Sequence, residues 1–176
     1  SASSAGRDPC PMRAAAASLA AALSVAPAEA ACRTAAEIGY DLIEVLMFDP
    51  ASLDIAMTSR AVQAAGLGLR LGMALGRETD ISSDDADVAG RGEATVARCL
   101  EIASELEAPG VSGIVYAAFN SYAAPPTERQ RASVVERLGR LDRRAGELGV
   151  KLGLEPVNRY ESFMVNTLDD AARVIR

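Results

Sequence analysis

Histidine is missing from this chain of 176 residues. Its absence excludes zinc sites that combine His with Cys, the Ser-His-Asp triad, and the commonest proton shuttle at neutral pH. Any chemistry that the chain performs must therefore rest on carboxylates, lysine, tyrosine or thiols.

An excess of positive charge and long apolar runs are missing as well. The 24 acidic side chains outnumber the 18 basic ones and give a net charge of −6. Nucleic-acid binding needs a basic face that neutralises phosphates, so this balance argues against it. No uncharged apolar run reaches the roughly 18 residues of a membrane-spanning helix. We therefore expect neither a nucleic-acid partner nor a membrane partner.

Cysteine is scarce, and the spacing of the three cysteines suggests no pairing. Cys10, Cys32 and Cys99 are widely spaced and form neither a CxxC motif nor a metal-ligand spacing. This usage predicts reduced thiols in a cytoplasmic protein.

The N-terminal segment, residues 1–27, is predicted to be a flexible or alanine-rich leader. The run from Met12 to Ala31 is similar to a short secretory signal. However, eleven residues that include Arg7 and Asp8 precede it, and alanine is only weakly hydrophobic. Residues 12–25 contain no convincing strand pattern.

From residue 28 onward, short apolar runs alternate with segments of helical periodicity. The expected strands are 42–48, 68–75, 111–117 and 150–155, and the expected helices are 28–38, 53–64, 96–106, 128–148 and 167–176. We expect Thr127 to cap the start of helix 128–148, and Gly66 and Gly149 to end the second and fourth helices. Alternation of this kind predicts one α/β domain, residues 28–176, with a parallel sheet and crossover helices. Periodicity does not distinguish a barrel from an open sheet, but the chain is short of the roughly 250 residues of a closed (β/α)₈ barrel.

Glu155 is the leading candidate for a functional side chain. It ends the apolar strand 150–155, and the carboxyl ends of parallel strands are where ligands bind in α/β folds. A carboxylate at that position must be hydrated, paired or bound to metal. The structural alternative is a bond to a neighbouring strand-end amide or to Arg159.

Glu44 and Glu161 are the next candidates. Glu44 is the one charge inside strand 42–48, and its alternative role is a strand-end salt bridge. Glu161 lies six residues after Glu155, where a loop carboxylate is usually just solvated. Two or three such carboxylates converging at strand ends would form an oxygen-rich site for Mg²⁺ or Mn²⁺.

Three other patterns have ordinary explanations. The glycine-rich segment 66–72 leads into a strand, whereas a phosphate cradle needs helix N-terminal amides. The aspartate-rich segment 80–87 lacks the Gly and distal Glu of an EF-hand, which favours a solvated loop. The arginines of helix 128–148 alternate with acidic residues, which is typical of a solvated outer face.

Several segments together resemble one enzyme family. They are 39–44 (Gly-Tyr-Asp-Leu-Ile-Glu), 80–83 (Asp-Ile-Ser-Ser), Tyr116 with 122–127, and above all 153–161 (Gly-Leu-Glu-Pro-Val-Asn-Arg-Tyr-Glu) followed by Asn166-Thr167. These segments resemble the sugar isomerases and epimerases of the xylose-isomerase-like TIM-barrel superfamily, in particular the D-tagatose/D-psicose 3-epimerases. The resemblance covers residues 28–176 and about the first five strands of eight.

The resemblance implies roles for the three glutamates. Glu155 matches a residue that binds Mn²⁺ or Mg²⁺ and transfers a proton. Glu161 matches a residue that contacts the sugar hydroxyls, and Glu44 resembles one that lines the substrate pocket. The implied reaction is epimerisation of a ketose or related small sugar through a metal-stabilised ene-diolate.

The same resemblance implies parts that have no match here. The family's other metal ligands (an Asp, a His and a second catalytic Glu) and a substrate-binding Arg belong to later strands. We therefore expect a partial (β/α)₈ barrel of four to five parallel βα units that does not close and is inactive alone. Open sheet edges would favour self-association into a homo-oligomer.

Three alternatives stay open at this stage. The substrate could instead be that of a hydroxypyruvate isomerase or of an inosose isomerase or dehydratase from the same superfamily. A non-catalytic half-barrel or pseudoenzyme that acts by association is the third. The endonuclease IV branch is disfavoured by the missing histidine and the negative charge.

Overall fold

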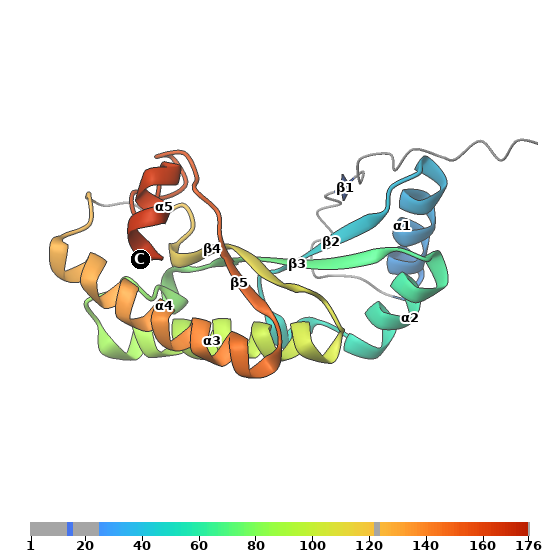
Figure 1. The fold of residues 1–176 in the computed structure, drawn as a ribbon, viewed down its shortest axis with the longest axis horizontal. Coiled ribbons are helices and arrows are strands. Elements are labelled where there is room, and N and C mark those ends of the chain that lie inside the picture. The colour runs from blue at the N-terminus through green and yellow to red at the C-terminus, as the bar shows by residue number, and fades with distance from the viewer. Residues whose placement is uncertain (1–13, 16–24, 122–123, 176) are drawn as a thin grey trace, which may run out of the picture.

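The computed structural model describes residues 14–15, 25–121 and 124–175, and it consists of parallel strands joined by helices (Figure 1). Five strands pair in chain order: β1 (Ala14–Ala15), β2 (Leu42–Met47), β3 (Gly68–Leu75), β4 (Gly110–Ala118) and β5 (Lys151–Leu154). All four pairings are parallel. Among the described residues β1 and β5 stay at the two edges, so the sheet is not closed. The predicted partial barrel is confirmed.

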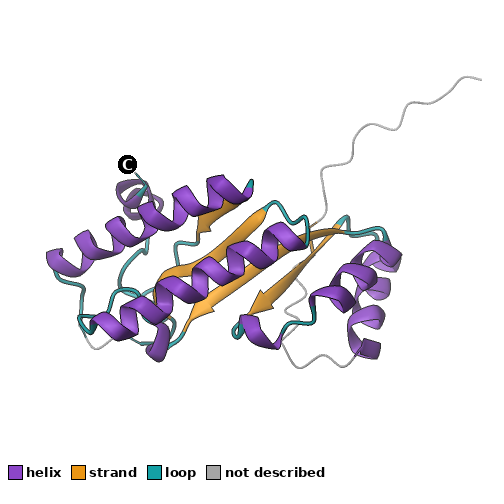
Figure 2. Ribbon diagram, turned by 90° about the horizontal axis from the view of Figure 1, so that it is seen from below, coloured by secondary structure: helices purple, strands orange, loops and turns teal. Residues whose placement is uncertain are grey.

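Helices connect the strands. They are α1 (Val25–Ile38), α2 (Ile55–Ala65), α3 (Ala86–Glu105), α4 (Glu128–Leu148) and α5 (Leu168–Val174), with two 3₁₀ turns at Pro50–Ser52 and Arg77–Thr79. Figure 2 shows α3 and α4 lying across one face of the strands. No helix in the described part of the chain is long and apolar enough to cross a membrane.

Local signals in the sequence set the helix boundaries. Gly66 and Gly149 end α2 and α4 in the left-handed conformation, with φ of 66° and 71°, which glycine adopts without a Cβ penalty. Thr127 begins α4 in a capping box with Gln130. These predicted starts and stops are confirmed.

The core lies between the sheet and the helices. Alternate residues of β2 and β3 point into it, among them Ile43, Val45, Leu71 and Met73, and all are buried. The two thiols in the described part, Cys32 and Cys99, are also buried and free. Burial raises the pKa of Cys99 to about 12, which keeps it a neutral core residue.

The strand β1 corrects one expectation. Ala14–Ala15 pairs with Leu42 and Ile43 inside the segment in which no strand was expected. Two alanines carry no alternation of apolar and polar residues, so the pairing leaves no trace in the sequence pattern. The rest of the predicted leader, together with Cys10, lies outside the described residues except for the first turn of α1.

The arginines around α4 correct another expectation. Instead of a purely solvated face, three of them bind α3: Arg140 contacts Glu93 at 2.6 and 2.8 Å, Arg137 contacts it at 3.0 Å, and Arg144 contacts Glu101 at 3.3 Å. The Glu93 side chain is only 23% exposed. These bonds hold the pKa of Glu93 below its usual range, mainly through the hydrogen bond from Arg140. The interface between α3 and α4 is therefore partly ionic.

Candidate functional site

A hollow opens over the middle of β2 and β3, the first half of β4 and the carboxyl end of β5. Its volume is ≈ 360 Å³, and its lining comprises Glu44, Leu46, Gly72, Met73, Ser112, Gly113, Leu154, Glu155 and Pro156. The structure thus brings two of the three predicted site residues, Glu44 and Glu155, to one hollow. Of the two, Glu155 follows the carboxyl end of its strand, which is the edge at which parallel α/β folds bind ligands.

Small side chains on neighbouring strands leave room for this hollow. The parallel register aligns Leu46, Gly72, Ser112 and Gly153 across β2, β3, β4 and β5. A Cβ atom built on Gly72 would lie 2.9 Å from Leu46 Cδ2 and 3.2 Å from Glu44 Oε1. The Glu44 carboxylate therefore lies over β3 in space that glycine leaves empty.

Glu155 is the first residue after β5. Its N–H donates to the Gly113 carbonyl at 3.1 Å, which continues the β4–β5 pairing for one residue. Its side chain is exposed and forms no hydrogen bond or ion pair with another described residue, so neither the strand-end amide nor Arg159 binds it. Glu44 is half-buried and likewise has no ionic partner among the described residues. Both carboxylates can therefore accept contacts from a ligand.

Glu161 lies on the loop that follows Glu155, outside the lining of the hollow. Its carboxylate accepts a hydrogen bond of 2.6 Å from Asn158 Nδ2. Its carbonyl accepts another from the Asn120 N–H at 2.9 Å, which ties the loop after β5 to the loop after β4. Glu161 is thus held in place next to the site.

Tyr116 is the residue whose individual role the sequence did not reveal. Its ring is fully buried, and the one proton of its hydroxyl is shared between the carbonyls of Glu155 at 2.8 Å and Val165 at 3.3 Å, the Glu155 contact being the shorter. Burial raises the pKa of Tyr116, and the charges of Glu155 and Glu161 raise it further. A lone tyrosine near the end of an apolar strand was the available signal, but its bonds join residues about 40 or more positions apart.

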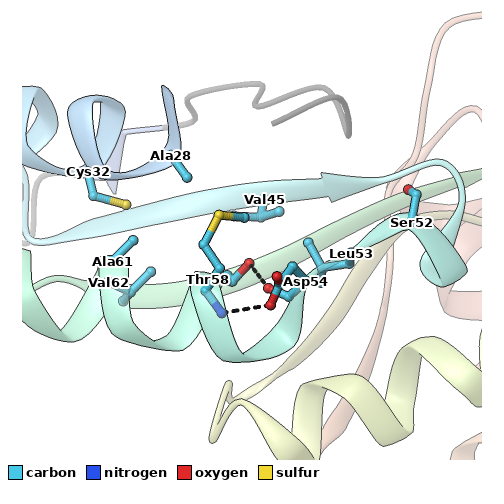
Figure 3. Close-up of a pocket in the computed structure, with 10 residues that line it drawn as sticks. Ala28, Cys32, Val45, Ser52, Leu53, Asp54, Thr58, Ala61 and Val62 are labelled. Atoms are coloured by element: carbon cyan, nitrogen blue, oxygen red, sulfur yellow. Dashed lines mark hydrogen bonds between the residues drawn. The ribbon is translucent and has the colours of Figure 1, made fainter. Parts of the chain in front are cut away.

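A second hollow lies between α1, α2 and β2 (Figure 3). It encloses only ≈ 30 Å³ and is lined mainly by small or apolar side chains such as Cys32, Val45 and Ala61. Asp54 at its edge accepts a hydrogen bond from the Met57 N–H and begins α2. This space is the size of about one water molecule, so it is a packing defect rather than a sugar site.

The aspartate-rich segment 80–87, which lies before and at the start of α3, supports the local structure. Asp80 accepts hydrogen bonds from the N–H and hydroxyl of Ser82, and Asp85 begins α3 by accepting from two backbone N–H groups. Asp84 forms an ion pair with Arg129. Across the described residues, no group of three or more His, Cys, Asp or Glu side chains is arranged to hold a metal ion.

The fold defines the class: parallel βα units of a partial TIM barrel. The family model "Xylose isomerase-like TIM barrel" matches residues 32–176. The chain therefore belongs to the xylose isomerase-like TIM-barrel family, and the predicted resemblance is confirmed.

Similar proteins are sugar epimerases. The chain is 36% identical over 131 residues to a ketose 3-epimerase of Arthrobacter globiformis, covering 74% of this chain and 45% of that protein. It is 32% identical over 144 residues to an L-ribulose 3-epimerase of a Methylomonas species, covering 82% and 50%. A crystal structure of D-allulose 3-epimerase from Methylomonas in complex with D-allulose superposes with a TM-score of 0.83 and 30% identity, covering 86% and 53%. The chain spans about half the length of these relatives.

Proposed function

We propose that this chain forms the N-terminal side of a ketose 3-epimerase site, with Glu155 as the residue that exchanges a proton with the sugar. The observation that carries the proposal is the convergence of Glu155 and Glu44 on one hollow of the parallel sheet, with Glu155 directly after the carboxyl end of β5. Family membership and the similarity to ketose 3-epimerases support it. The substrate class is then a ketose or a related small sugar.

The proposed reaction inverts one carbon next to a ketone. The C3–H bond breaks, the proton passes to a carboxylate, and the electron pair moves toward the C2 carbonyl to give an ene-diolate. Return of a proton to the opposite face of C3 gives the epimer. Glu155 suits the first transfer because its carboxylate is exposed and unpaired within the described residues.

Glu44 and Glu161 have binding roles in this proposal. A carboxylate accepts hydrogen bonds from sugar hydroxyls without itself needing a proton. Glu44 lies over Gly72 within the hollow, and Glu161 is oriented by Asn158. They would orient the sugar so that C3 faces Glu155, because proton transfer requires hydrogen-bond distance.

A divalent metal fits this part of the site only incompletely. Carboxylate oxygens are the ligands that Mn²⁺ and Mg²⁺ prefer, and Glu155 offers them. The described residues provide no cluster of three ligands, so we assign Glu155 as one ligand and assign no step to the metal. The second proton-transfer group for C3 is likewise not assigned to a described residue. We propose that the 176-residue chain alone turns over no ketose.

The test is a fusion protein. It joins this chain to the C-terminal half of a relative, which is the half that this chain does not cover. Residues 1–176 would be fused to the C-terminal half of the Arthrobacter globiformis ketose 3-epimerase and assayed with D-fructose and D-tagatose in the presence of Mn²⁺. We expect 3-epimerase activity from the fusion and none from the 176-residue chain. Product analysis over a panel of ketoses would distinguish C3 epimerisation from the isomerase alternatives.

Two substitutions test the role of Glu155 in that fusion. Glu155→Gln keeps the shape but removes the proton acceptor, and we expect at least a hundredfold loss of kcat, the usual scale for a general base. Glu37→Gln on α1, also an exposed carboxylate, is the matched control and should leave kcat unchanged. An inactive fusion that is folded, or an active Glu155→Gln variant, would refute the proposal.

A further inference from the structure

The segment that follows β5 closes on itself through hydrogen bonds. The Val157 N–H donates to the Val165 carbonyl at 3.1 Å. The Asn166 side-chain amide donates to the carbonyls of Val157 at 2.8 Å and Ser162 at 2.7 Å. We call residues 155–166 the acidic loop, because Glu155 lies at its start and Glu161 within it.

Tyr116 connects this loop to the core. Its ring is fully buried on β4, and its one hydroxyl reaches two carbonyls, those of Glu155 and Val165. Glu155 is the first residue of the acidic loop, and Val165 lies at its other end. A single side chain therefore fixes both ends relative to the sheet, and the Asn120 N–H fixes Glu161 from the other side.

The contact at Glu155 is made to its own main-chain carbonyl. Displacement of that peptide group would turn the Cα of Glu155 and move its carboxylate away from the hollow.

We propose that Tyr116 is a positioning residue, which holds the acidic loop so that the carboxylate of Glu155 keeps a fixed orientation toward the hollow and Glu161 stays beside it. This inference rests on the proposed function of those two glutamates. Tyr116 acts through the main chain and does not touch the substrate.

The test compares two tyrosines of the full 176-residue chain. Tyr116→Phe retains the buried ring and removes the hydroxyl. Tyr160→Phe is the matched control, because Tyr160 lies in the acidic loop itself, is 80% exposed, and its hydroxyl has no hydrogen-bond partner among the described residues. Hydrogen exchange by NMR would follow the amides of Glu155, Val157 and Asn120, which donate the bonds that order the loop.

We expect Tyr116→Phe to speed exchange at these amides about tenfold, the scale of one lost hydrogen bond, with exchange in β2 and β3 unchanged. Tyr160→Phe should change nothing. Asn166→Ala, which loosens the loop without touching the core, should reproduce the local effect and guards against a Tyr116→Phe variant that fails to fold. Unchanged exchange at the three amides, or a uniform increase over the sheet, would overturn the proposal.

A second readout separates positioning from general stability. Mn²⁺ alone is added to the full chain, and broadening of the Glu155 and Glu161 resonances is followed. We expect Tyr116→Phe to require severalfold more Mn²⁺ for the same broadening, whereas Tyr160→Phe requires the same amount. If the unaltered chain shows no broadening at Glu155, the metal-ligand role of Glu155 fails, and the exchange experiment still decides whether Tyr116 orders the loop.

Discussion

The two faces of the sheet differ in how completely they are covered. On the helix side, Ile43 and Leu71 are 0% exposed, and an ionic contact at Glu93 joins the covering helices. On the other side, Glu44 and Leu46 are only half-buried and Gly72 leaves a hollow beside them. The same strands supply both faces, because successive side chains alternate. Stability is therefore concentrated on one face, and the other is available for binding.

The largest effect is expected on the helix side. Leu71→Ala removes a fully buried side chain from close-packed surroundings, so the lost transfer free energy and the new cavity add up to about 2–5 kcal/mol. Chemical denaturation would measure the free energy of unfolding. A loss smaller than that of any substitution in the hollow would contradict the division between the faces.

The ionic contact between α3 and α4 is expected to contribute less. Glu93→Gln removes the charge that Arg137 and Arg140 share, and we expect a loss of about 1 kcal/mol because the group is partly solvated. The pKa of Glu93 is lower in the native than in the unfolded state, so its contribution is present above the ordinary value of 4.5 and disappears as pH falls through the native pKa. The stabilities of the variant and the parent should therefore converge as the pH falls below 4.5 and through the native pKa, as followed by thermal unfolding.

Gly72→Ala is expected to affect the hollow more than the fold. The new Cβ would lie 2.9 Å from Leu46 Cδ2 and 3.2 Å from Glu44 Oε1, and both are ends of side chains that can move. We expect a change of less than about 1 kcal/mol in the free energy of unfolding and a displaced Glu44 carboxylate in a crystal structure of the variant. A large loss of stability with Glu44 in place would show that this face also bears the fold.

Glu155→Gln should have the smallest effect on stability. The side chain is exposed and has no ionic or hydrogen-bonding partner among the described residues. We expect the unfolding transitions of the variant and the parent to coincide, although the proton-transfer role proposed above would be lost. A clear loss of stability would indicate a structural role instead.

The sequence predicted those features that depend on neighbouring residues. Gly66, Gly149 and Thr127 mark helix ends because φ preference and capping are local, and the strand 68–75 was predicted at its observed bounds. Glu44 and Glu155 were singled out because a charge in an apolar strand is conspicuous, and both line one hollow, while their roles stay predictions.

Features that depend on distant contacts were missed. The bond from Tyr116 to the loop after β5 and the pairing of Ala14–Ala15 with β2 have no local signature. The role of Arg140 could be seen only in the structure, because its partner Glu93 lies on another helix, 47 positions earlier in the chain. Sequence periodicity shows which face of a helix is polar but not what faces it.

The strictly sequential order of the strands has a consequence for how the chain reaches its fold. Each strand from β2 to β5 pairs with the strand that precedes it in the chain, so no pairing needs a segment that has yet to be synthesised. A domain assembled in this way can add one strand and one helix at a time as the polypeptide emerges, and each new unit finds its template already formed. The growing edge at any moment is the newest strand, which makes that edge the site most exposed to mispairing during synthesis.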